Sequence, residues 1–181
     1  NHKTAGSIFG KEIAIIGAGS IAQRLKNMLQ PFHCNVMIFG QSARDGVESI
    51  STVQAHLKKF DCVVLLVPLT TTTRNLVDAQ FLGAMKDGAL LVNVARGPVV
   101  NTEALCAELA RKRIFAALDV TDPEPLTQGH PLWGFENCTV IPHVGGDSDA
   151  FEPQARIFLA DQFQRVAQSG QPINIIDWKN Q

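Results

Sequence analysis

The sequence predicts an α/β protein built on a doubly wound parallel sheet with helices on both faces, and three observations support this prediction. Short apolar runs alternate with helical patterns along nearly all of the 181 residues. Each run is apolar at almost every position, as in strands that are buried on both faces of a parallel sheet. Hydrophobic residues make up 45% of the chain and charged residues 18%, which is enough apolar surface for a packed core.

The first half of the chain contains three of the expected strands, at residues 12–16, 35–39 and 62–67. Between the first two, apolar residues recur at helical spacing from Ile21 to Leu29. Pro31 ends this helix because proline lacks the N–H group that would continue it. Residues 41–48 are expected to form an irregular loop, and a short helical stretch at 51–59 leads to the third strand.

The second half contains three more strands, at residues 89–93, 115–119 and 138–141. One helix is expected at 79–85, and another begins at Asn101, whose side chain can cap the first turn. A last, long helix ends near Gly170. Its apolar face consists of Ala155, Phe158, Leu159, Phe163 and Val166. Six strands in βαβ alternation predict the sheet order 3-2-1-4-5-6.

The segment Gly17-Ala-Gly-Ser-Ile-Ala22 joins the first strand to the first helix and matches the dinucleotide fingerprint G-x-G-x-x-[GA]. Gly17 permits the tight turn, and Gly19 lets the backbone approach a pyrophosphate. The N–H groups near Ser20 and Ile21 would then bind the negative charge at the start of the helix. This context predicts a Rossmann fold that binds NAD or NADP.

The end of the second strand indicates which of the two dinucleotides is preferred. An NAD site places an acidic residue about 20 residues past the glycine turn, where it binds the ribose hydroxyls. Here that region reads Gly40-Gln-Ser-Ala-Arg44, without a carboxylate. Ser42 can donate a hydrogen bond to a 2′-phosphate and Arg44 can supply the opposing charge. The sequence therefore predicts a preference for NADP over NAD.

Polar residues follow the last three strands, where the loops of such a sheet bind ligands. Arg96 can hold a carboxylate with its two parallel N–H groups, and His143 is suited to proton transfer. Glu124 can stabilise the imidazolium form of the histidine, and Asp119 precedes it in the same loop. Together they predict chemistry on small 2-oxo and 2-hydroxy acids.

These motifs resemble, in order, the nucleotide-binding domain of the D-isomer-specific 2-hydroxyacid dehydrogenases. The matching segments are Gly17–Ala22, Val67–Thr73, Asn93–Gly97, Leu118–Pro125 and Pro142–Gly145. The resemblance implies that Arg96, Glu124 and His143 bind substrate and catalyse, with the histidine as acid and base. It also implies contacts with the cofactor from Pro68, Thr73, Val94, Ala95, Asp119 and Gly145.

The family resemblance also shapes the expected domain organisation. We expect a linker at residues 1–10 from a missing substrate domain, a dinucleotide-binding domain at 11–175 and a C-terminal tail at 176–181. Because family members close a second domain over the substrate, this chain by itself is expected to be inactive. Family members also dimerise through this domain, and Phe151, Phe158 and Phe163 supply aromatic surface for a homodimer.

Composition excludes several other classes of function. Sixteen basic and 17 acidic residues leave a net charge of −1, which gives no reason to bind nucleic acid or a membrane surface. The four cysteines show no metal-ligand spacing and fit reduced thiols in the cytoplasm. The remaining alternatives are a dinucleotide-sensing corepressor without turnover and, within the same fold, a formate dehydrogenase, whose relatives depart from glutamate at the position of Glu124.

Overall fold

The chain divides into two compact units, Asn1–Pro142 and His143–Gln181. In this computed structural model, residues 6–175 are described, and each unit is considered by itself. The first half of the expected linker at 1–10 and the whole expected tail at 176–181 lie outside the described residues. The proposed limits of the dinucleotide-binding domain stay a prediction.

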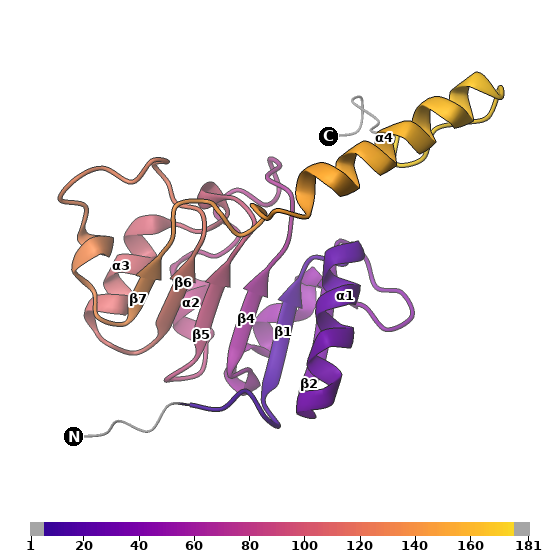
Figure 1. Ribbon diagram of the computed structural model, residues 1–181. Coiled ribbons are helices and arrows are strands. Elements are labelled where there is room, and N and C mark those ends of the chain that lie inside the picture. The colour runs from indigo at the N-terminus through magenta and orange to yellow at the C-terminus, as the bar shows by residue number, and fades with distance from the viewer. Residues whose placement is uncertain (1–5, 176–181) are drawn as a thin grey trace. The chain divides into compact units, whose positions relative to one another are not determined.

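The first unit is built on one seven-stranded sheet, in the order β3-β2-β1-β4-β5-β6-β7 (Figure 1). All neighbouring strands are parallel. The strands are β1 (Glu12–Ile16), β2 (Asn35–Gly40), β3 (Glu48–Ser49), β4 (Cys62–Leu65), β5 (Leu90–Asn93), β6 (Phe115–Leu118) and β7 (Cys138–Val140). The predicted fold class is confirmed.

The predicted strand order is wrong in one respect. The run at 62–67, expected third and therefore outside the second strand, is β4 and pairs with β1. The position outside β2 is taken by β3, where Phe39 is paired with Glu48 and Gly40 with Ser49. This strand falls at the end of the supposed irregular loop. Its two polar residues carry no apolar run, so the pairing with β2 alone makes it a strand.

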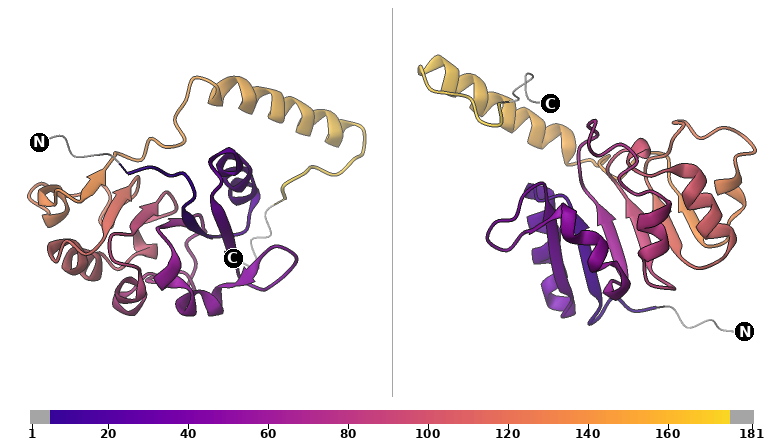
Figure 2. Two further views of the ribbon diagram at one scale, coloured as in Figure 1. Left: turned by 90° about the horizontal axis from the view of Figure 1, so that it is seen from below. Right: turned by 180° about the vertical axis from the view of Figure 1, so that it is seen from behind.

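Helices cover both faces of the sheet, with α1 on one face and α2 and α3 on the other (Figures 1 and 2). The α-helices of this unit are α1 (Ser20–Leu29), α2 (Ala79–Ala84) and α3 (Thr102–Ala110). Asn101 caps α3, as predicted, by accepting a hydrogen bond from the N–H of Ala104 at 2.9 Å. Short 3₁₀ helices complete the connections: η1 (Gln30–Phe32), η2 (Ile50–Ala55), η3 (Leu57–Lys59), η4 (Gly97–Val99) and η5 (Pro131–Gly134).

The helical stretch predicted at 51–59 is therefore two 3₁₀ turns, η2 and η3, and not one continuous helix. Ser49 caps the first turn by accepting a hydrogen bond from the N–H of Ser51. The β-branched side chains in this segment, Ile50, Thr52 and Val53, disfavour a longer α-helix. The buried Val53 and Leu57 still attach the segment to the core.

The core has two layers because successive residues of a strand point to opposite faces of the sheet. Ile13 and Ile15 of β1 pack with Ala22 and Leu29 of α1 on one face. The intervening Ala14 and Ile16 belong to the larger layer, which includes α2, α3 and the turn η2. Ala22, the last residue of the dinucleotide fingerprint, is fully buried in the layer that contains α1.

The second unit contains one helix in its described residues 143–175, α4 (Phe151–Ala167). Its end near Gly170 is confirmed, since the Gly170 N–H donates to the Arg165 carbonyl at 2.8 Å. The apolar face of the helix is not covered within this unit, because α4 has no buried residue. A lone helix and its flanking loops offer no second apolar layer to pack against.

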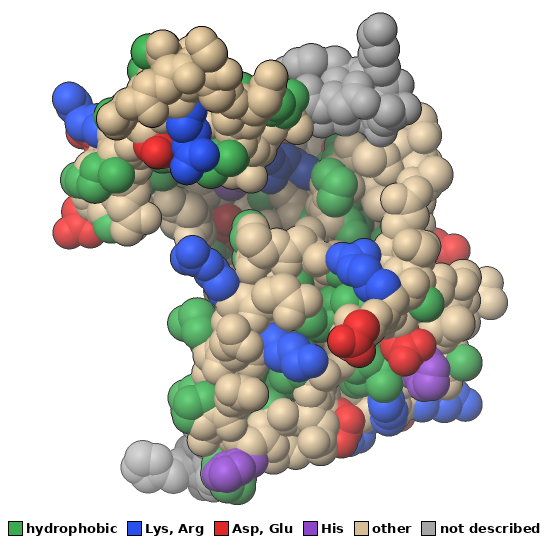
Figure 3. Space-filling model, turned by 90° about the vertical axis from the view of Figure 1, so that its right-hand side faces the viewer, with side chains coloured by type: hydrophobic (Ala, Val, Ile, Leu, Met, Phe, Trp, Pro, Cys, Tyr) green, Lys and Arg blue, Asp and Glu red, His purple; other side chains and the backbone are tan. Residues whose placement is uncertain are grey.

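The surface carries charges of both signs. On the face that Figure 3 shows, basic and acidic side chains are interspersed and form no extended patch of one sign. No helix in the described part of the chain is long and apolar enough to cross a membrane. Within residues 6–175 no group of three His, Cys, Asp or Glu side chains is placed to hold a metal ion.

Candidate functional site

The turn after β1 accepts only glycine at its first position. Gly17 has φ +119°, a conformation that residues with a side chain rarely adopt. A Cβ atom at Gly17 would also lie 2.6 Å from the carbonyl oxygen of Leu66. The Gly17 N–H donates to the Phe39 carbonyl at 2.8 Å, so the turn is fixed between β2 and the end of β4.

The following residues leave the start of α1 accessible to a ligand. Gly19 is the N-cap residue, and no side chain caps the helix there. A Cβ at Gly19 would have no atom within 4 Å, so its Cα faces open space. The first turn of α1, with Ser20 and Ile21, contains no acidic residue that would repel an anion. Free helix N–H groups and the helix dipole both favour a phosphate at this position, so the turn fits a pyrophosphate.

The loop after β2 brings Arg44 to the same turn. Its Nη2 donates to the Ala18 carbonyl at 2.9 Å. The loop itself is held by two backbone hydrogen bonds between Arg44 and Val47, each 2.9 Å long. A Cβ at Gly40 would lie 3.0 Å from both Ala18 and Val47 and 3.7 Å from Arg44 Nη1. Gly40 therefore makes room for the guanidinium beside the glycine turn, and Ser42 lies exposed between the two in the chain.

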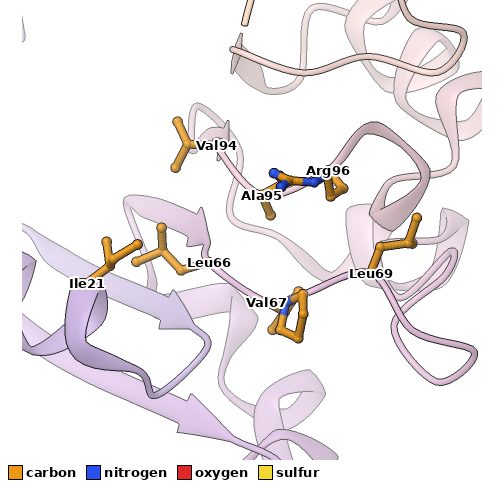
Figure 4. A pocket seen from close by; sticks show the side chains of 8 residues that line it. Ile21, Leu66, Val67, Leu69, Val94, Ala95 and Arg96 are labelled. Carbon is orange, nitrogen blue, oxygen red and sulfur yellow. The ribbon is translucent and has the colours of Figure 1, made fainter. Parts of the chain in front are cut away.

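A pocket of about 480 Å³ opens between α1, the chain after β4 and the chain after β5 (Figure 4). It is lined by Ile21, Leu66, Val67, Pro68, Leu69, Val94, Ala95 and Arg96. The structure thus brings together five of the predicted site residues: Ile21, Pro68, Val94, Ala95 and Arg96. Leu66, Val67 and Leu69 are additional lining residues that were not predicted, although their position just after the carboxyl end of a parallel strand was a signal for them.

Thr73 lies outside this lining and is hydrogen-bonded to one wall of the pocket. Its hydroxyl donates to the Pro68 carbonyl at 2.7 Å and accepts from the Thr70 N–H at 2.8 Å. These two bonds close the loop that follows Pro68. Thr73 is therefore placed to hold the Pro68 wall, while Pro68 itself faces the pocket.

The chain after β5 is packed directly against the chain after β6. A Cβ at Gly97 would lie only 1.8 Å from the Thr121 carbonyl oxygen, so the two backbones touch. Asp119 is 6% exposed, and its N–H donates to the Asn93 carbonyl at 2.9 Å. Glu124 is exposed in the same loop, which Thr102 joins through a 3.0 Å hydrogen bond to the Asp122 carbonyl. Asp119 and Glu124 do not line the pocket, but their loop is held against the one that carries Arg96.

The last two predicted residues, His143 and Gly145, belong to the second unit. His143 directly follows the stretch in which the Ile141 N–H donates to the Leu118 carbonyl at 2.9 Å. Its own φ is +54°, a conformation in which histidine is more common than most residues. Since each unit is described by itself, the position of both residues beside the pocket stays a prediction.

A family model described as "D-isomer specific 2-hydroxyacid dehydrogenase, NAD binding domain" matches residues 1–145. The chain belongs to this family. The match extends from before β1 through the glycine turn, the pocket loops and Gly145, so it contains every candidate site residue named above.

Two curated relatives of this family domain are reductases. The chain is 37% identical over 148 residues to a glyoxylate reductase of Thermofilum pendens, covering 78% of this chain and 44% of the relative. It is 36% identical over 141 residues to the glyoxylate reductase/hydroxypyruvate reductase of Homo sapiens, covering 74% and 43%. The chain thus spans less than half the length of these two relatives.

A solved structure gives the same fold. A D-isomer specific 2-hydroxyacid dehydrogenase from Xanthobacter autotrophicus Py2, in complex with NADPH and MES, superposes with a TM-score of 0.86 at 30% identity. The superposition covers 97% of this chain and 75% of the other. The chain therefore has the Rossmann fold of this NAD-binding domain family.

Proposed function

We propose that the protein is an oxidoreductase that transfers a hydride between NAD(P)H and a small 2-oxo or 2-hydroxy acid. This chain is its cofactor-binding domain. The observation that carries the proposal is the continuity of one site: the uncapped start of α1 follows the glycine turn, and Ile21 of α1 also lines the pocket that contains Arg96. A dinucleotide bound by its pyrophosphate at the turn would extend into that pocket.

Three residues are proposed to act on the substrate. Arg96 would bind the substrate carboxylate through two N–H groups and polarise the neighbouring carbonyl. The bound dinucleotide supplies the hydride that the carbonyl carbon accepts. His143 would donate a proton to the resulting alkoxide and take it back in the reverse direction. Glu124 would orient the imidazole and stabilise its charged form.

The remaining predicted residues are proposed to hold the cofactor. Val94, Ala95 and Pro68 already line the pocket in the first unit, and Thr73 holds the Pro68 loop. Asp119 and Gly145 are assigned to the nicotinamide end on the basis of the family motifs that contain them. The enzyme names of the relatives favour turnover and do not support a corepressor without activity.

A turnover assay of the full-length protein tests the reaction. Glyoxylate, hydroxypyruvate and other 2-oxo acids would be supplied with NADH or NADPH, and absorbance at the nicotinamide band would be followed. We expect His143→Ala to lower kcat by about 100-fold or more while the dissociation constant of the dinucleotide changes little. A full-length protein that binds the dinucleotide but reduces no 2-oxo acid would contradict the enzyme proposal and favour a sensor.

We also propose that NADP is preferred over NAD. Arg44 is fixed 2.9 Å from the Ala18 carbonyl, beside the turn that would hold the pyrophosphate, and no carboxylate lies at Gly40 to repel a 2′-phosphate. Ser42, in the same loop, would add a hydrogen bond. A charge-assisted contact contributes about 1.5–3 kcal/mol, which corresponds to a preference of roughly tenfold or more. The related Xanthobacter structure holds NADPH.

Dissociation constants of NADPH and NADH, measured with this chain by nicotinamide fluorescence, test the preference. Arg44→Ala should weaken NADPH binding about tenfold and leave NADH binding nearly unchanged. Lys58→Ala is the control, since it removes one exposed positive charge from η3, before the amino end of β4. Equal affinity for the two dinucleotides, or an Arg44→Ala variant with an unaltered ratio, would refute the assignment.

The proposed assembly is a homodimer in the cytoplasm. Phe151, Phe158 and Phe163 of α4 are 68%, 41% and 74% exposed, which is unusual for so many aromatic side chains on one helix. The four cysteines are all free thiols, which suits a reducing compartment. Light scattering of the full-length protein should give twice the monomer mass, and a monomer at high concentration would contradict the dimer.

A further inference from the structure

The turn that carries Arg96 is held from beneath by a buried asparagine. Asn93 is the last residue of β5 and is 1% exposed. Its Oδ1 accepts a hydrogen bond from the Ala95 N–H at 3.1 Å. Its Nδ2 donates to the Arg96 carbonyl, also at 3.1 Å. One side-chain amide therefore satisfies a donor and an acceptor on the same three-residue turn.

Both halves of the amide are needed for this arrangement. The Ala95 N–H donates to the amide oxygen and the Arg96 carbonyl accepts from the amide nitrogen, so the side chain must supply an acceptor and a donor that both reach the turn. Aspartate would place a second oxygen against the Arg96 carbonyl oxygen. Leucine, of similar shape, would leave the Ala95 N–H without this acceptor and the Arg96 carbonyl with its bond from the Val99 N–H alone. A buried polar group that loses its partner is costly.

The turn that Asn93 holds forms one wall of the pocket. Val94, Ala95 and Arg96 all line the pocket (Figure 4). The guanidinium of Arg96 is itself directed along this turn, because its Nη1 donates to the Ala95 carbonyl at 2.6 Å. A change in the path of the backbone at Ala95 would therefore move the guanidinium as well as the apolar wall.

The other side of the turn leaves little freedom. The backbone at Gly97 is in contact with the Thr121 carbonyl, and the Val99 N–H donates to the Arg96 carbonyl at 3.2 Å. The turn is thus fixed at its far end by main-chain contacts and at its near end by the Asn93 side chain. Of these two attachments, only the near one depends on a side chain.

We propose that Asn93 is a positioning residue, which sets the place of Arg96 and thereby the affinity of the site for the carboxylate of its substrate. The inference rests on the proposed function, because it takes Arg96 as the carboxylate-binding group. Asn93 does not line the pocket, so it acts through the turn and not by touching the substrate. The pyrophosphate turn at Gly17–Gly19 lies on a different loop and should be unaffected.

The test compares Asn93→Ser and Asn93→Asp with the unchanged full-length protein. We expect the KM for a 2-oxo acid and the inhibition constant of oxamate, an unreactive 2-oxo amide with a carboxylate, to rise about 10- to 100-fold. The dissociation constant of the preferred dinucleotide should change less than these two constants, because its pyrophosphate binds at another loop and only its contacts with Val94 and Ala95 depend on this turn.

A control variant separates positioning from stability. Asn137 also uses its Nδ2 to bind main-chain carbonyls, those of Leu109 at 3.1 Å and Ile114 at 2.7 Å. It precedes β7, so it lies at the amino end of the sheet while the pocket lies at the carboxyl end. Asn137→Ser should lower the free energy of unfolding and leave the KM and the oxamate constant unchanged.

A double-mutant cycle with Arg96→Met decides whether Asn93 acts through the arginine. If it does, Asn93→Ser should add less than about twofold to the KM in the Arg96→Met background. An undiminished effect in that background, or an unchanged oxamate constant in both single variants, would overturn the proposal. If the unchanged protein binds the dinucleotide but shows neither turnover nor oxamate binding, the proposed function is wrong. Hydrogen exchange would then still test the structural part of the inference, because Asn93→Ser should reduce the protection of the Ala95 N–H if the Asn93 side chain holds the turn.

Discussion

Replacing Gly97 with alanine should separate the loops that follow β5 and β6. The new Cβ would lie 1.8 Å from the Thr121 oxygen, 2.2 Å from its carbonyl carbon and 2.8 Å from the Asp122 nitrogen. All three atoms belong to the backbone, so no side-chain rotation can relieve the overlap. To reach the 3.4 Å at which ordinary contact begins, the two chains must move apart by about 1.6 Å.

The cost of this movement can be estimated from its parts. Forcing one extra carbon into a packed region costs about 1–3 kcal/mol where neighbours can adjust, and here only the backbone can. The movement also strains the hydrogen bond from Thr102 to the Asp122 carbonyl, which contributes about 1 kcal/mol. Alanine has less conformational entropy in the unfolded state than glycine does, and this offsets less than about 1 kcal/mol of the cost. Gly97→Ala should therefore lower the free energy of unfolding by at least about 3 kcal/mol.

Urea unfolding followed by circular dichroism measures this difference. Gly83→Ala is the matched control, since Gly83 lies on the exposed side of α2 and its Cβ would meet no atom within 4 Å. That variant should gain about 0.5–1 kcal/mol, because alanine favours a helix more than glycine does. A Gly97→Ala variant as stable as the unchanged chain would show that the two backbones are not in contact.

Three further predictions concern side chains away from the pocket. Burial raises the pKa of Asp61, but the hydrogen bonds from Lys86 (2.7 Å) and from the Glu12 N–H, together with the charge of Lys11, outweigh burial and lower this pKa below its ordinary value of 3.8. Asp61→Asn should therefore reduce the free energy of unfolding at neutral pH by about 1–2 kcal/mol. In acid titrations this difference should vanish as the pH falls through the lowered pKa. Glu108→Gln removes the charge of a carboxylate whose side chain is 11% exposed and lies 2.5 Å from Arg113, and it should lower the free energy of unfolding in urea by about 2–4 kcal/mol. Glu136 pairs with Lys112 at 4.0 Å, with side chains 90% and 78% exposed, so Glu136→Gln should cost less than about 0.5 kcal/mol. Similar losses in the two variants would contradict the role of burial. Burial raises the pKa of the Cys62 and Cys138 thiols to about 11. At pH 8, mass spectrometry should therefore detect alkylation of these two cysteines by iodoacetamide only after unfolding. Rapid alkylation in the folded chain would contradict their burial.

The sequence alone determined the elements whose signal is local. Continuous apolar runs located six of the strands because a parallel sheet buries both faces of each strand. Asn101 marked the start of α3 because a cap is a bond between residues three positions apart. The glycine turn was equally readable, since Gly17 is required by a single backbone conformation as well as by the approach of Leu66.

The tertiary structure decided the features that depend on residues distant in the chain. The strand β3 exists only because Glu48 and Ser49 pair with β2, and neither residue has a strand pattern of its own. Leu66, Val67 and Leu69 became pocket residues only when β4 was placed beside β5. The apolar stripe of α4 illustrates the reverse, because periodicity shows which side chains share a face but not what that face meets.

Asn93 and Gly97 lie at the boundary between these two kinds of information. Both belong to the motif that the sequence marked around Arg96, yet their roles depend on contacts of less than 3.5 Å with the turn and with the chain after β6. A sequence pattern records which residue types occur together, and it contains no distances. Whether an asparagine supports a turn or a glycine admits a neighbouring backbone is decided only when the strands bring those segments into contact.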